Sequence, residues 1–363
     1  MKLSASLLIC LVTVVFVLSA HSQAPSNAIS DSAFWKMIRD YSEADGQFPY
    51  ENFVSNEVNY QTVIPKLVED VKPGGVYIGV GPDQNFAYAL ALKPSVAFII
   101  DIRRQNLQEL LMYKALFDLS PERPDFVARL FARRRPAGLN RDSTTEALFA
   151  AFGKVPVDPA FASETLNAIL ANLKRHGFQP QSGDEAGIRK VYLAFVEGGP
   201  VLAWGSGWTP TYADLMTKTD GAGKNRGYLA TEENYRAVQE LERANRIVPL
   251  VGDFAGTKAI RAVGQFARDQ HQIVSVFYLS NVEQYLFASG SWPAFYANVA
   301  TLPLDSSSVF IRAVYQEKDC AAPIHRMILG SDFLTVLQPM MDVTRRHRAN
   351  QLTNYCDTVG DVP

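Results

Sequence analysis

A glycine turn, followed twenty residues later by an aspartate, is the feature of this chain best suited to bind a ligand. Gly79 and Gly81 end the apolar run of residues 76–80, and Asp101 follows the next apolar run. In α/β proteins that bind nucleotides, such a turn lets the backbone approach the ligand, and an acid after the second strand accepts hydrogen bonds from the ribose. The spacing therefore predicts a nucleotide-type site at these three residues.

Two later apolar runs also end in polar side chains. Asp253 and Phe254 follow residues 247–251, and Asn281 and Glu283 follow residues 273–279. A positioned glutamate could act as a general base on a hydroxyl or amine, and Asn281 could orient that acceptor, so both are candidate catalytic residues. Alternatively, Ser280 or Asn281 caps the helix that follows.

Other candidates come with open alternatives. Arg103 could bind a carboxylate on a ligand, pair with Asp101 or reach solvent. Asn56 and Glu57 could fold over the site or be structural. Seven glycines lie within residues 198–227, alongside aromatics such as Trp208, which is typical of a lid or substrate-facing loop. The alternative for that segment is an irregular surface region packed on neighbouring helices.

Composition limits the class of protein. The chain has 363 residues, of which 47% are hydrophobic and 20% charged, so it can bury one large core. A formal net charge of −2 creates no field that attracts nucleic acid, and we expect no nucleic-acid partner. Neither His-Glu-x-x-His nor paired Cys-x-x-Cys occurs, so no metal site is predicted. The expected partner is a small-molecule ligand, and the oligomeric state stays open.

Residues 1–24 are typical of a secretory signal peptide, because Lys2 precedes an apolar run that small residues follow. We expect an exported protein, periplasmic or extracellular, without a stable membrane span after processing. A retained anchor is the alternative, although the run is shorter than the ~20 residues that cross a bilayer. In an oxidising compartment, Cys320 and Cys356 would form a disulfide or remain separate buried thiols.

Strand-like runs alternating with helical periodicity predict an α/β fold with a doubly wound, Rossmann-like sheet. The connection after the second strand is too long for a simple crossover, so it is a large, mainly helical insertion. The predicted parts are an N-terminal helical segment (25–72), two halves of the core (73–117 and 246–316), the insertion (118–245) and a C-terminal helical tail (317–363), with its helix around residues 332–346.

The strand ends resemble, in order, the first four motifs of class I S-adenosylmethionine-dependent methyltransferases. Closer phrases, such as Ser55-Asn56-Glu57, Tyr77-Ile78-Gly79-Val80-Gly81-Pro82 and Ser280-Asn281-Val282-Glu283, resemble an uncharacterised bacterial family with that fold, from about residue 34 to 315.

The resemblance implies that the Rossmann-like sheet is of the methyltransferase type and that S-adenosylmethionine is the cofactor. It places the methionine end of the cofactor at Gly79 and Gly81, the ribose at Asp101, and the adenine at Asp253 and Phe254. The candidate substrate contacts are Arg103, Tyr285 and Trp208.

The chain also departs from the methyltransferase pattern. Tyr77 stands at the strand centre, Pro82 follows Gly81, and Gln84 stands where a third glycine would fall in an NAD-type site. Two hypotheses follow: methyl transfer to a small acceptor, or an exported binding or interaction protein that keeps the fold without catalysis.

Overall fold

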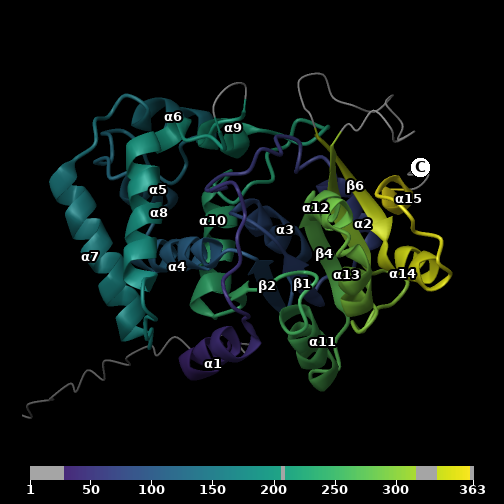
Figure 1. Cartoon of the computed structure of the whole chain (residues 1–363). Coiled ribbons are helices and arrows are strands. Elements are labelled where there is room, and N and C mark those ends of the chain that lie inside the picture. Colours follow the sequence, from purple (N-terminus) through teal and green to yellow (C-terminus); the bar gives the residue numbers. More distant parts are fainter. Residues whose placement is uncertain (1–27, 206–208, 316–332, 360–363) are drawn as a thin grey trace, which may run out of the picture.

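A computed structural model describes residues 28–205, 209–315 and 333–359, and a six-stranded sheet lies at its centre. The strand order is β3-β2-β1-β4-β5-β6, and Figure 1 shows helices on both sides of this sheet. The strands are β1 (Val76–Gly79), β2 (Val96–Asp101), β3 (Ile247–Val251), β4 (Val274–Ser280), β5 (Val309–Tyr315) and β6 (Phe333–Pro339).

Strands β1 to β5 run parallel, and β6 pairs antiparallel with β5. Every residue of β1, β2 and β3 is buried, which explains their continuous apolar runs, because helices cover both faces of a parallel sheet. This confirms the predicted α/β class and is consistent with a Rossmann-like fold, with an antiparallel strand added at one end.

The strand order reverses between β1 and β4. From β1 the chain moves outward to β2 and β3, then returns to place β4 on the opposite side of β1. In open α/β sheets, ligands bind outside the carboxyl ends of the strands at such a reversal. The carboxyl ends of β1 and β4 are therefore the first place to look for a site.

Helices α3 and α4 connect the first three strands, and α11, α12 and α13 connect the later ones. The helices around the sheet are α1 (Asp31–Tyr41), α2 (Ile64–Asp70), α3 (Gln84–Leu92), α4 (Arg104–Leu119), α10 (Glu232–Arg243), α11 (Ala259–Asp269), α12 (Val282–Ser289), α13 (Trp292–Val299), α14 (Met340–Arg348) and α15 (Cys356–Val359).

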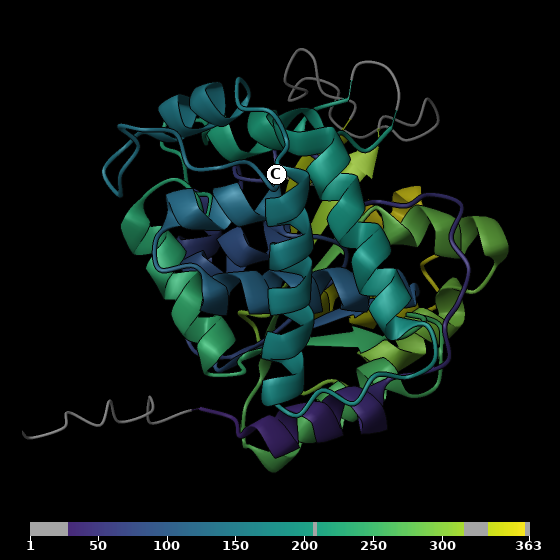
Figure 2. The same ribbon diagram turned by 90° about the vertical axis from the view of Figure 1, so that its left-hand side faces the viewer.

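The segment between β2 and β3 is mainly helical and covers one side of the molecule, which faces the viewer in Figure 2. After α4 it contains α5 (Arg123–Leu130), α6 (Thr145–Phe152), α7 (Pro159–Arg175), α8 (Asp184–Gly198), the short 3₁₀ helix η1 (Gly199–Val201) and α9 (Tyr212–Thr217), before α10. The start of α7 shows how the local sequence fixes these helices. Asp158 accepts a hydrogen bond from the backbone N–H of Phe161, and Pro159 occupies the first turn, where no N–H is needed.

The C-terminal tail corrects one prediction. Residues 333–339 were predicted to be helical, and they form β6, with helix α14 starting only at Met340. The apolar run in this segment pairs along the whole of β5, whose edge would otherwise leave backbone groups unpaired. Cys356 is disulfide-bonded, whereas Cys320 lies outside the described residues, so the pairing between them stays a prediction.

Residues 42–57, which we call the strap, cross the carboxyl edge of the sheet. In Figure 1 this is the purple chain that leaves α1 and rises past the strands. The backbone N–H of Glu43 donates to the carbonyl of Val251 (2.8 Å), and that of Gly46 donates to the carbonyl of Ile102 (2.9 Å). The N-terminal segment therefore covers the ends of β3 and β2 before the chain enters β1.

None of the helices in the described ranges combines the length and the apolar character that a bilayer span requires. The leader predicted at residues 1–24 lies outside those ranges.

Candidate functional site

The glycine turn after β1 is shaped by the chain's own side chains. A Cβ added to Gly79 would lie 2.0 Å from Oδ1 of Asn85, so no larger residue fits there. The Asn85 amide donates to the carbonyls of residues 80–82, and the Tyr77 hydroxyl donates to its Oδ1 (2.7 Å). Gly81 has a φ of +76°, which favours glycine. Both glycines are thus explained by the turn itself, and their contact with a cofactor stays a prediction.

Asp101 ends β2 as predicted, but its carboxylate already has a partner. Its Oδ1 accepts from the backbone N–H (2.9 Å) and Nε (3.0 Å) of Arg103, and its Oδ2 accepts from Nη2 (2.9 Å). The same guanidinium donates to the strap carbonyl of Glu51. Of the alternatives for Arg103, the pairing with Asp101 is the one observed. A ribose bound at Asp101 would have to share or displace this pair.

Asp253 lies at the same edge of the sheet as Asp101. The residue before it, Gly252, donates its backbone N–H to the Asp101 carbonyl (2.9 Å). The strap closes this corner, where the carboxylate of Glu43 accepts from the backbone N–H groups of Asp253, Lys258 and Ala259.

Phe254, predicted beside an adenine ring, is buried. Its ring packs against Phe277 (5.0 Å between centroids) and Phe295 (5.7 Å) in the core. Nothing in these contacts tests whether it also touches a ligand.

Glu283 is buried in an ion pair on the β5 side of α12. Its carboxylate accepts from the guanidinium of Arg312, which is fully buried on β5, and from the hydroxyl of Tyr296. Asn281 is the N-cap residue of α12, but its side chain makes no capping hydrogen bond and donates to Gln284 instead (3.1 Å). The catalytic roles predicted for Asn281 and Glu283 remain predictions, and the structure explains Glu283 through its pairing.

Tyr285, predicted to contact substrate, lies partly exposed beside the strap. Its ring packs edge-on against Phe48 (5.0 Å), and Tyr50 of the strap packs against Trp204 (4.8 Å). Trp208, the third predicted substrate contact, lies outside the described residues.

The carboxyl group that reaches the reversal between β1 and β4 belongs to Glu57, at the end of the strap. Its side chain is buried, at 2% exposure. Oε1 accepts from the hydroxyls of Tyr278 (2.7 Å) and Ser280, both on β4, while Oε2 has no hydrogen-bond partner. The structure places Glu57 at the carboxyl end of β4, against the residue before Asn281, and both alternatives for its role stay predictions.

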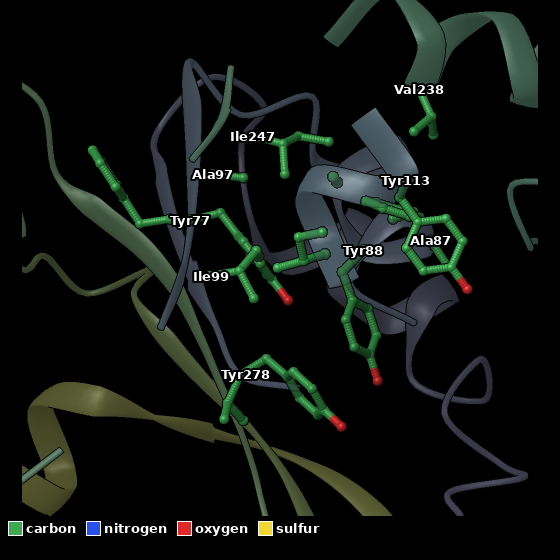
Figure 3. Packing of buried hydrophobic residues seen from close by; sticks show 14 of the residues in the cluster. Tyr77, Ala87, Tyr88, Ala97, Ile99, Tyr113, Val238, Ile247 and Tyr278 are labelled. Carbon is green, nitrogen blue, oxygen red and sulfur yellow. The ribbon is translucent and has the colours of Figure 1, made fainter. Parts of the chain in front are cut away.

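Tyrosines and a glutamine surround the Glu57 carboxyl at the strand reversal, the crevice position where open α/β sheets bind ligands. Gln84 donates to the Tyr278 hydroxyl (2.8 Å), and its own Oε1 has no partner. Figure 3 shows Tyr77, Tyr88 and Tyr278 with their hydroxyl groups turned the same way. Burial raises the pKa of Glu57 to about 7, against the opposing effect of the hydrogen bonds from Ser280 and Tyr278.

A second acid, Asp83, occupies the N-cap position of α3. It is buried, and its Oδ2 accepts from the hydroxyl of Tyr228 (2.9 Å), a residue of the insertion. Burial raises the pKa of Asp83 to about 6, opposed mainly by that hydrogen bond. In NAD-type sites a helix N-terminus at this position holds the ligand's pyrophosphate. An acidic side chain there disfavours phosphate groups.

Two buried atoms around Glu57 have no partner: its own Oε2, which accepts hydrogen bonds when the carboxyl is ionised, and Oε1 of Gln84. A ligand that fits must therefore donate hydrogen bonds, and the nearby carboxyls favour one with positive charge. Across the described ranges, no three His, Cys, Asp or Glu side chains gather in a way that could hold a metal ion.

The sequence analysis gave no site role to Asp83, Tyr278 or Gln84. The available signal was bulk and polarity at unexpected positions: a glutamine in place of a third glycine, and a tyrosine within the apolar run of β4.

Comparison with known proteins gives a family without an activity. The sequence profile of a family described as a domain of unknown function (DUF7790) matches residues 52–357, which is most of the chain. No curated protein is significantly similar to it.

Proposed function

This chain belongs to the family described as a domain of unknown function (DUF7790), and we propose that it is an S-adenosylmethionine-dependent methyltransferase acting on a small acceptor. The observation that carries this proposal is the carboxyl group of Glu57. It lies buried at the reversal of strand order, beside the glycine turn, with one oxygen unpartnered. Ligands of open α/β sheets bind at this position.

The chemistry of the crevice selects among nucleotide-type ligands. Its unpartnered atoms on Glu57 and Gln84 accept hydrogen bonds, and Asp83 occupies the place of a phosphate. A dinucleotide would bring negative charge to this acidic surface. S-adenosylmethionine carries a sulfonium and an ammonium group and donates from its amino and hydroxyl groups, so it complements the crevice better.

When bound, S-adenosylmethionine supplies an electrophilic methyl group. An acceptor nitrogen or oxygen that took up this methyl group would have to lose a proton. Glu57 would take that proton, because a pKa of about 7 suits a general base at neutral pH. Tyr278 and Ser280 hold its carboxyl group in place through their hydroxyls.

One observation favours a second candidate, the exported binding protein without catalysis. Arg103 occupies both carboxylate oxygens of Asp101, and Glu43 of the strap is bound to the loop that carries Asp253. The edge is closed by the chain's own groups, as it would be in a protein that no longer takes a cofactor there.

Calorimetric titration separates the two candidates. We expect the mature protein to bind S-adenosylmethionine more tightly than S-adenosylhomocysteine, which lacks the sulfonium charge, and not to bind NAD. Glu57→Gln should weaken the binding of S-adenosylmethionine by roughly ten- to a hundred-fold, because it removes a charge-assisted contact worth about 1.5–3 kcal/mol.

The matched control is Glu51→Gln, which changes an exposed strap carboxylate that pairs with Lys190. It should leave the affinity unchanged. Absence of binding to either S-adenosyl compound at millimolar concentration would reject the methyltransferase proposal and leave the binding protein.

A further inference from the structure

We propose that helix α4 forms one wall of a second site, which binds the ammonium group of a small organic amine. Its residues are Asn106 and Glu109 on α4 and Asp83 at the start of α3. The site is distinct from Glu57, and the proposal does not require that S-adenosylmethionine is the cofactor.

Three polar side chains form a buried stripe along α4. Asn106, Glu109 and Tyr113 follow one another at spacings of three and four residues, which places them on one face of the helix, and each is fully buried. Both carboxyl oxygens of Glu109 lack a hydrogen-bond partner, and so do both the nitrogen and the oxygen of the Asn106 amide. Each such group costs about 1–3 kcal/mol when left unsatisfied.

The Asn106 amide is what distinguishes this place from a simple cluster of acids. Repulsion between carboxyl groups could explain a neutral, unpaired Glu109, but it does not explain a buried amide with nothing to bind. An ammonium group has three N–H donors, which match the carboxyl of Glu109 and the Oδ1 of Asn106, while the Asn106 amide nitrogen would donate to the ionised carboxylate.

The groups around Glu109 favour its protonated form and provide no free counter-charge for its ionised form. Burial and then the charge of Asp83 raise the pKa of Glu109 well above its usual range, with Asp101 adding to this effect and Arg103 opposing it. The guanidinium of Arg103 is already bound to Asp101 and to the strap. The titratable groups that complete the surroundings are tyrosines: Tyr113 on α4, Tyr212 on α9 and Tyr228 after it. Arg103 is the cation among the main charges that act on Glu109, and it is engaged elsewhere, so an ammonium group would supply the counter-charge of an ionised Glu109.

Aromatic rings enclose the same region. The ring of Phe86 on α3 packs edge-on against Tyr113 (5.6 Å between centroids) and Tyr228 (5.2 Å), and Phe117 packs against Phe86 (5.6 Å). The Tyr228 hydroxyl is the one bound to Asp83. Aromatic faces attract cations and also accept an alkyl chain, so the ligand class is an alkylamine and not a metal ion.

The test uses n-butylamine, with n-butanol as the neutral analogue of the same length. Because Glu109 is fully buried, binding requires a local opening, and a small probe is the appropriate choice. We expect the full chain as purified to bind n-butylamine at millimolar concentration and n-butanol at least ten-fold more weakly. Titration at pH 7 in two buffers of different ionisation enthalpy should show release of about one proton per amine, since Glu109 must ionise to pair with it.

Glu109→Gln should weaken the binding of n-butylamine at least ten-fold and abolish the proton release. The control is Glu242→Gln, which changes another buried carboxyl with an unpartnered oxygen, one that already has Lys114 beside it. It should leave amine binding unchanged. Asn106→Leu, which keeps the volume and removes the acceptor, gives an independent reading if Glu109→Gln fails to fold.

Equal binding of n-butylamine and n-butanol, or unchanged amine affinity in both Glu109→Gln and Asn106→Leu, would overturn the proposal. Repeating the titration with and without S-adenosylmethionine keeps the two proposals apart. Amine binding without any S-adenosyl binding would reject only the methyltransferase, and the reverse result would reject only the amine site.

Discussion

Glu57→Gln should make the protein less sensitive to rising pH. The pKa of Glu57 is raised from 4.5 to about 7 by burial, so the folded state holds the neutral carboxyl more tightly than the unfolded chain does. Its contribution to stability is complete below pH 4.5 and is lost as the pH rises through about 7. Glutamine resembles the neutral carboxyl and does not titrate.

The size of the effect follows from the shift. One pKa unit corresponds to about 1.4 kcal/mol, and the shift from 4.5 to about 7 makes the free energy of unfolding fall by about 2.5 kcal/mol between pH 5 and pH 8. Urea unfolding of both proteins across that range should show the variant gaining this amount relative to the unchanged chain. Other titrating groups, Asp83 included, are common to both proteins and cancel in the difference.

A constant difference in unfolding free energy between the two proteins, within about 0.5 kcal/mol from pH 5 to pH 8, would refute the reasoning. It would mean that Glu57 ionises freely in the folded state and that the crevice is open to water. A difference of the opposite sign would mean that an unrecognised cation holds Glu57 in its charged form. The exposed Glu51→Gln variant serves again as the control.

Two further predictions concern stability. Glu283→Gln should lower the free energy of unfolding by about 3–5 kcal/mol in urea, because it leaves the buried guanidinium of Arg312 without a counter-charge. The double variant Glu283→Gln with Arg312→Met should recover part of that loss. A Glu283→Gln variant as stable as the unchanged chain would contradict the structural role of Glu283. Gly79→Ala should lower the melting temperature more than Gly81→Ala. The methyl group added at Gly79 collides with Asn85, whereas alanine at position 81 costs only about 1 kcal/mol of backbone strain. The reverse order in a thermal scan would show that Asn85 does not hold the turn.

The sheet could be predicted from the sequence because its strands are buried on both faces. Continuous apolar runs leave few alternatives, and each run ends where its strand reaches the polar edge, so Asp101 and Asp253 were placed on one edge correctly. The segment at 333–339 was assigned wrongly because its strand exists only through pairing with β5, a partner that periodicity does not reveal.

The contents of the crevice were harder to predict for a different reason. Sequence patterns show which residue types follow a strand, but not which groups their side chains contact in the folded protein. From the sequence alone, Glu283 and Glu57 look equally suited to proton transfer. In the structure, Glu283 forms an ion pair with Arg312, whereas Glu57 accepts a hydrogen bond from Tyr278, which is more than two hundred residues away in the sequence. Long-range partners of this kind decide whether a carboxyl is neutralised or left reactive.

The strap has a consequence for the order in which the protein is made. Glu43 is 210 residues from Asp253, to which it is hydrogen-bonded, and Glu57 is 221 residues from Tyr278. During synthesis the strap emerges early and can pair with residues after β2, but Glu43 and Glu57 lack these partners until β3 and β4 have left the ribosome. In that interval Glu57 is solvated and ionised at neutral pH. Because burial raises the pKa of Glu57 to about 7, docking of the strap is expected to take up a proton in part of the molecules near neutral pH, which makes this step of folding sensitive to pH.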